Sequence, residues 1–130
     1  MRNVLYSFLV LGLLFSCGPK EGQQDLGATE FQTALTAESK AQILDVRTID
    51  EFQNGHIEGA LNADISSSAF QQIASGLDKD KTVFVYCLSG ARSASAAGML
   101  KEMGFKSIIN LTGGMLAWQS ANLPIATGEA

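Results

Sequence analysis

The sequence places a cysteine, Cys87, between a run of apolar residues and a helical pattern. The apolar run, Thr82–Tyr86, is rich in β-branched and aromatic residues and predicts a buried parallel strand. A thiolate that follows a strand and precedes a helix faces unpaired amide groups and the positive end of the helix dipole. Because both lower the pKa of a thiol, this position predicts that Cys87 is a nucleophile.

Two further residues of the segment Cys87-Leu88-Ser89-Gly90-Ala91-Arg92-Ser93 suit an anionic ligand. Gly90 allows the loop to curl so that successive amide groups point inward. Arg92 supplies a permanent cation, which fits an oxyanion such as the sulfonate end of thiosulfate. The alternative is a structural cysteine with Arg92 on the surface, because free cysteine is often buried and inert.

The other cysteine, Cys17, has a different context. It follows Val4–Phe15, an apolar run of about twelve residues that is too short to span a bilayer and has the length of a signal-peptide core. The run ends in Leu14-Phe15-Ser16-Cys17, which resembles the lipobox of bacterial lipoproteins, where the cysteine is acylated. We therefore expect residues 1–16 to be a signal peptide and Cys17 to carry lipid; an ordinary secretory signal or a retained helix is the alternative.

Export and anchoring would leave a small mature protein on the periplasmic side of a bacterial membrane. Its expected parts are a flexible, Gly-rich tether over residues 17–28 and one domain over residues 29–128. Pro19 stands where an Asp would mark retention in the inner membrane, which favours the outer membrane. With Cys17 acylated, Cys87 is the sole free thiol and no intramolecular disulfide can form.

Charge and composition exclude several kinds of partner. Nine basic and thirteen acidic residues give a net charge of −4, without a basic cluster. This argues against nucleic acid as a partner and against electrostatic docking on anionic lipid, so membrane contact is expected from the acyl chains alone. With one histidine and no cysteine cluster, a metal site has no support. We expect a monomer without a cofactor.

Short apolar runs alternate with amphipathic stretches in the rest of the chain. Strands are expected at residues 43–46, 60–63, 82–86 and 107–111, and helices at residues 29–38, after Thr48, around Phe70 and Ile73, at residues 93–103 and at residues 115–120. This alternation predicts an α/β fold with a central, mostly parallel sheet and helices on both faces. In such sheets ligands bind at the carboxyl ends of the strands, where Cys87 is expected.

Three segments, in order along the chain, resemble the signatures of the rhodanese family. They are Leu44-Asp45-Val46-Arg47 with Glu51-Phe52 and Gly55-His56-Ile57-x-Gly59-Ala60-x-Asn62; Tyr86-Cys87-x-Ser89-Gly90-x-Arg92-Ser93 with Ala96-Ala97; and Asn110-Leu111-x-Gly113-Gly114-x-x-Ala117-Trp118. The resemblance implies a rhodanese-like fold and an enzyme of the thiosulfate sulfurtransferase type. In that family's chemistry, Cys87 would accept a sulfane sulfur from a thiosulfate-like donor as a persulfide.

The resemblance also implies roles for the rest of the loop. The backbone amides of Leu88, Ser89, Gly90, Ala91 and Arg92 would cradle the outer sulfur. Because no second thiol is available to resolve the persulfide, an external thiol or cyanide must take the sulfur. The six residues from Cys87 to Arg92 match sulfur-transferring members, whereas the related phosphatases and arsenate reductases have one residue more. The alternatives are a binding module that docks a redox or sulfur-handling partner and, disfavoured by the loop length, a phosphatase or arsenate reductase.

The remaining candidates favour structural roles. His56, the only histidine, would have to lie beside Cys87 to serve a Cys–His hydrolase, and a structural hydrogen bond is expected instead. Asp45 and Arg47 are expected near the site as a buried charge pairing, with Arg47 meeting Asp45 or Glu51. Trp118 is expected in the core. Gly113-Gly114 predicts a turn and not a phosphate loop, because no lysine follows at the required spacing.

Overall fold

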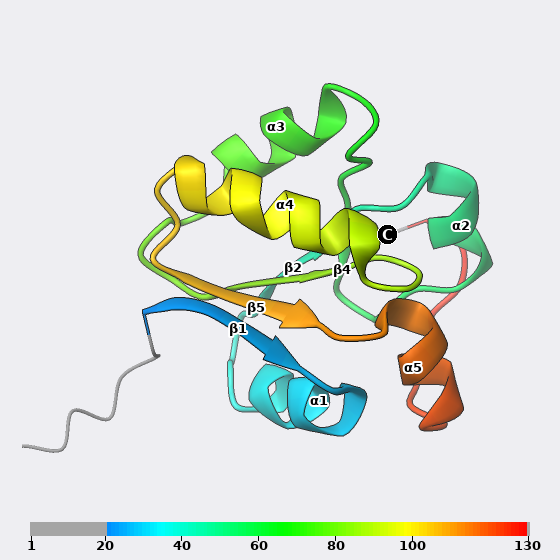
Figure 1. The fold of residues 1–130 in the computed structure, drawn as a ribbon. Helices are drawn as coiled ribbons and strands as arrows, with labels where there is room; N and C mark the ends of the chain where they lie inside the picture. The colour runs from blue at the N-terminus through cyan, green and yellow to red at the C-terminus, as the bar shows by residue number, and fades with distance from the viewer. Residues whose placement is uncertain (1–20, 130) are drawn as a thin grey trace, which may run out of the picture.

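Five parallel strands form one sheet in the order β1-β5-β4-β2-β3 (Figure 1). The computed structural model describes residues 21–129, and its strands are β1 (Gly22–Leu26), β2 (Gln42–Asp45), β3 (Leu61–Asn62), β4 (Val83–Tyr86) and β5 (Ser107–Leu111). All four pairings are parallel, with β4 in the middle between β5 and β2. The expected α/β fold with a central parallel sheet is confirmed.

Five helices cover the sheet. They are α1 (Ala28–Thr36), α2 (Ile49–Asn54), α3 (Ala69–Ser75), α4 (Ala91–Glu102) and α5 (Gly114–Ser120). Figure 1 shows α3 and α4 on one face, α1 and α5 on the other, and α2 beside the carboxyl ends of the central strands. Within residues 21–129, no helix is long and apolar enough to cross a membrane.

The side chains of β4 divide the interior into two apolar clusters. Val83, Val85 and the following Cys87 face α3 and α4, whereas Phe84 and Tyr86 face α1 and α5. Each of these five residues is almost completely buried. Burial on both faces explains why the run is continuously apolar, as the sequence predicted, and not alternating.

The cluster on the α1 side is built around aromatic rings. The ring of Phe31, from α1, meets Phe84 edge to face at 5.4 Å between centroids and Trp118, from α5, at 6.3 Å. Edge-to-face contacts of this kind add to the stabilisation from buried area. The expected core position of Trp118 is confirmed, and its Nε1 donates a hydrogen bond to the carbonyl of Pro124 at 2.8 Å.

Local signals in the sequence set the boundaries of the helices near the site. Helix α2 begins after Thr48, as expected, and Thr48 and Glu51 form a capping box at its start. Helix α4 begins two residues earlier than predicted, directly after Gly90, whose φ of 113° is reached easily only by glycine. It ends before Gly104, which has the left-handed conformation expected of a helix terminator (φ 98°).

The tether predicted over residues 17–28 is wrong from Gly22 onward. Residues Gly22–Leu26 form the edge strand β1, and α1 already begins at Ala28. The strand is held by backbone bonds to β5, and Asp25 accepts a further bond from the Asn110 side chain at 3.1 Å. Edge strands need little apolar surface, so its polar residues gave no strand signal. The expected signal peptide, Cys17 and residues 18–20 lie outside the described residues.

The register of β1 predicts an alternating pattern of amide hydrogen exchange. The Gly22 amide donates to Lys106 and the Leu26 carbonyl accepts from Thr112, so even-numbered residues of the strand face β5. The amides of Gln24 and Leu26 should therefore exchange about tenfold or more slower than those of Gln23 and Asp25, as NMR can measure. Uniformly fast exchange would show that the segment is a tether after all.

Candidate active site

Cys87 lies directly after the central strand, at the carboxyl edge of the sheet. Its side chain is on the α4 side and the residue is only 1% exposed. The next three residues form a tight loop that enters α4 at Ala91. The sulfur therefore lies beneath the N-terminus of α4, where the amide groups of the first turn have no partner within the helix.

Short contacts from the loop converge on the sulfur. The Gly90 amide donates to Cys87 Sγ at 3.1 Å. The Cys87 thiol donates to the hydroxyl of Ser93, in the first turn of α4, at 3.4 Å, and that hydroxyl donates to the Gly90 carbonyl at 3.2 Å. When the thiol ionises, the Ser93 hydroxyl can rotate to donate to the sulfur, so that it and the Gly90 amide stabilise negative charge there.

The balance of these effects favours the thiolate. Burial raises the pKa of the Cys87 thiol, but hydrogen bonds from the Ser93 side chain and from the amides of Ser93, Gly90 and Ser89 outweigh it. The net pKa of Cys87 is below its ordinary value. Because the thiolate is the nucleophile, the loop activates this cysteine.

Helix α5 holds the loop in this shape from the other side. The Met115 and Leu116 amides donate to the carbonyls of Cys87 (2.8 Å) and Leu88 (3.1 Å). In a trans peptide the N–H points opposite to the C=O, so the amides of Leu88 and Ser89 are turned away from α5. The contribution of the Ser89 amide to the lowered pKa of Cys87 agrees with this direction.

Gly114 permits this close approach of helix and loop. A Cβ at residue 114 would lie 2.5 Å from the carbonyl oxygens of both Cys87 and Leu88, and its φ is 57°. A side chain there would push the loop away from α5. The Gly113-Gly114 pair is thus the predicted turn, and the structure adds that this turn supports the Cys87 loop.

The sequence predicted Arg92 as a cation available to an anionic ligand, but in the structure Arg92 is paired with a carboxylate. Its two terminal nitrogens donate to the two carboxylate oxygens of Glu51 at 2.8 and 2.9 Å. Arg92 lowers the pKa of Glu51 to about 2, so this carboxylate is ionised at neutral pH. The sequence offered Glu51 as a possible partner of Arg47 and not of Arg92, because nothing in a linear pattern indicates that α2 lies beside the start of α4.

The second arginine near the site forms the expected buried ion pair. Arg47 donates to both oxygens of Asp45, at 2.6 Å for the shortest contact, and to the Gly55 carbonyl at 2.7 Å. Burial alone would lower the pKa of Arg47, but the hydrogen bond and charge of Asp45 raise it overall. Of the two partners that the sequence allowed, Asp45 is the one observed. The pair fixes the segment that leads from β2 into α2.

His56 makes structural contacts. Its Nδ1 is 2.8 Å from the Phe52 carbonyl, and its ring stacks on that of Phe52 with 3.8 Å between centroids. Its backbone pairs with Ala126, which joins the end of the chain to the turn after α2. These contacts agree with the structural role that the sequence favoured.

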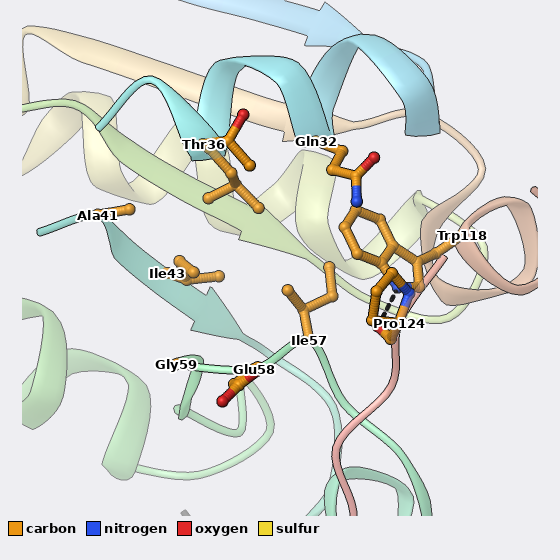
Figure 2. Close-up of a pocket in the computed structure, with 10 residues that line it drawn as sticks. Gln32, Thr36, Ala41, Ile43, Ile57, Glu58, Gly59, Trp118 and Pro124 are labelled. Carbon is orange, nitrogen blue, oxygen red and sulfur yellow. Dashed lines mark hydrogen bonds between the residues drawn. The ribbon is translucent and has the colours of Figure 1, made fainter. Parts of the chain in front are cut away.

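Two hollows are present on the described surface. A pocket of about 250 Å³ opens beside the Cys87 loop and is lined by Arg47, Glu51, Asn54, Gly55, Leu88 and Gln119. A larger one, of about 350 Å³, lies on the α1 side between Leu35, Ile43, Ile57 and Trp118 (Figure 2). The larger pocket lies on the face of the sheet opposite Cys87, whereas the smaller one borders the Cys87 loop through Leu88.

The fold and the site together define a class of protein: a parallel α/β domain whose cysteine, with a lowered pKa, lies in an amide-lined loop at the end of the central strand. Among residues 21–129, no group of three His, Cys, Asp or Glu residues is placed to hold a metal. The sequence profile of the rhodanese-like domain matches residues 27–121. The chain belongs to the rhodanese-like family.

Curated relatives carry sulfurtransferase names. Thiosulfate sulfurtransferase 18 of Arabidopsis thaliana is 36% identical over an alignment of 110 positions that covers 75% of this chain and 81% of the relative. Thiosulfate sulfurtransferase GlpE of Shewanella oneidensis is 36% identical over 88 residues, which is 68% of this chain and 85% of the relative.

Solved structures agree on the fold. A rhodanese-related protein from Thermoplasma volcanium has a TM-score of 0.69 at 27% identity, over 79% of this chain and 97% of its own. The rhodanese-like domain of the Anabaena sp. Alr3790 protein has a TM-score of 0.71 at 28% identity, over 79% and 78% of the two chains. The expected rhodanese-like architecture is confirmed.

The contacts of the sulfur predict how Cys87 responds to a change at Ser93. In Ser93→Ala the hydroxyl bond to Sγ is lost, so the pKa of Cys87 should rise and the thiolate fraction at neutral pH should fall. The pH dependence of alkylation by iodoacetamide, with the product mapped to Cys87, measures this shift. Ser95→Ala, an exposed change in the same helix, is the matched control. An unchanged pH profile in Ser93→Ala would show that the Ser93 hydroxyl does not lower the pKa of Cys87.

Proposed function

We propose that the protein transfers a sulfane sulfur from thiosulfate or a related donor to a thiophilic acceptor through a persulfide on Cys87. The observation that carries this proposal is the hydrogen-bonded sulfur of Cys87, which accepts the Gly90 amide at 3.1 Å and has a lowered pKa. Membership of the rhodanese-like family and relatives named thiosulfate sulfurtransferase support the same chemistry.

The first half-reaction loads the cysteine. The Cys87 thiolate attacks the outer sulfur of thiosulfate, a new S–S bond forms, and the bond to the sulfonate sulfur breaks. Sulfite leaves with the electron pair of that bond, so no external oxidant or reductant is needed. A nucleophile poised as a thiolate begins this step without a separate base.

The second half-reaction removes the outer sulfur from the Cys87 persulfide. A thiolate or cyanide attacks the outer sulfur of the persulfide. The S–S bond breaks, and Cys87 returns to the thiolate form in which the first step began. The amides of residues 88–92 are the groups we propose for holding the transferred sulfur between the two steps, since a persulfide anion carries its charge on that atom. With no second thiol in residues 21–129, the acceptor comes from outside this domain.

Replacement of Cys87 by serine tests the proposal directly. On incubation with thiosulfate, the unchanged protein should gain the mass of one sulfur atom and lose it again with a thiol reductant. Cys87→Ser should gain nothing and should lose transfer from thiosulfate to cyanide, while its circular dichroism stays the same. Cys17→Ser, the matched change at the other cysteine, should still load. If Cys87→Ser still gains sulfur, Cys87 is not the residue that carries it.

The binding-module alternative differs in turnover. A module that only docks a sulfur-handling partner would show neither the gain of sulfur nor cyanide-dependent turnover. The activated state of Cys87 favours the enzyme, because a docking surface needs no thiolate.

We also propose that the protein is exported and lipid-anchored through Cys17. The support is the sequence alone: a short apolar run that ends in Leu14-Phe15-Ser16-Cys17. Expressed in a bacterial host with a clickable palmitate analogue, the full chain should take up label and sediment with membranes. Cys17→Ser should lose the label and move to the soluble fraction. Equal labelling of both proteins would exclude Cys17 as the acylated residue.

A further inference from the structure

The ion pair between Arg92 and Glu51 joins two helix N-termini at the site. Arg92 lies in the first turn of α4, and its guanidinium makes two parallel bonds to the Glu51 carboxylate. Glu51 is itself held in place, because its Oε1 accepts from the backbone and hydroxyl of Thr48 in the capping box. The two side chains are 37% and 30% exposed, and the bidentate geometry with a fixed carboxylate favours the paired state.

Other cations do not replace it at this edge of the sheet. In residues 21–129 the two arginines, Arg47 and Arg92, are both bonded to carboxylates. The lysines of that part of the chain precede β2, β4 or β5 or lie in the last turn of α4: Lys40, Lys79, Lys81, Lys101 and Lys106. They therefore lie toward the amino ends of the strands, away from Cys87. The pocket beside the loop has no lysine in its lining.

We propose that Glu51 is a specificity-determining residue, which holds Arg92 and so weakens the site for doubly charged donors such as thiosulfate relative to less charged ones. The inference rests on the proposed function for its substrate class. It means that α2, through Glu51, influences which donors react at the Cys87 loop.

The physical reason is the net charge that a donor meets. With Glu51 present, Arg92 and Glu51 cancel each other at short range, and a dianion gains little from the guanidinium. Without the carboxylate charge, a dianion gains twice what a monoanion gains at the same distance. The pKa of Glu51, held at about 2 by Arg92, keeps the carboxylate ionised throughout the neutral range.

Glu51→Gln is the variant that tests this role. Glutamine also completes a capping box, so α2 should keep its N-terminus. In rates of thiosulfate loading followed by intact mass, we expect KM to fall about fivefold at low ionic strength, with kcat nearly unchanged. The difference should shrink at high salt, as expected for screened charges.

Asp50→Asn is the matched control. Asp50 lies in the same first turn and is exposed, and it is not a partner of Arg92 in the described part of the chain. It removes one negative charge without freeing the guanidinium, so KM should stay close to that of the unchanged protein. An equal fall in Asp50→Asn would mean a general field effect and would overturn the assignment to the ion pair.

A second measurement does not depend on sulfur transfer. The ratio of alkylation rates of Cys87 by iodoacetate and by iodoacetamide compares an anion with a neutral reagent at the same thiol. This ratio should rise about two- to threefold in Glu51→Gln. If the unchanged protein takes no sulfur from thiosulfate but the ratio rises, the proposed function fails while the electrostatic role stands. If the protein loads sulfur but KM rises or stays constant and the ratio does not change, Glu51 does not set specificity.

Discussion

The burial of β4 on both faces and along both edges is the constraint on which the rest of the site depends. With β5 and β2 hydrogen-bonded on either side and an apolar cluster above and below, the strand has no freedom to shift its register. Cys87 therefore leaves the sheet at one fixed point and on one fixed face. The N-terminus of α4 and the first amides of α5 contact Cys87 at that point. The ion pairs Arg47–Asp45 and Arg92–Glu51 hold the neighbouring segments in place.

The parts of the fold that a linear pattern predicted are those with a strong local signal. Residues 107–111 form a strand with the expected bounds because every side chain is buried, and α2 starts at its capping box. The strand β1 was missed because its stability comes from backbone pairing at a sheet edge. The partner of Arg92 was missed because Glu51 lies 41 residues away, and only the assembled fold brings the two together.

The Cys87 loop depends on a helix that comes later in the chain. The amides of Met115 and Leu116 fix the loop carbonyls, and Gly114 makes the contact sterically possible. During synthesis Cys87 precedes these residues, so the loop gains these two hydrogen bonds only when α5 packs. Thiolate reactivity is in this sense a property of the completed domain.

With the lipid anchor that we propose at Cys17, the strand β1 would also limit the height of the domain above a membrane. From Cys17 to Gly22 there are five residue steps, which span at most about 18 Å when fully extended. With the lipid anchor that we propose, the amino ends of the strands would stand close to the bilayer. The Cys87 loop, at the carboxyl ends, would then point into the aqueous compartment. Such an upright orientation presents the persulfide to soluble acceptors and turns it away from the lipid surface.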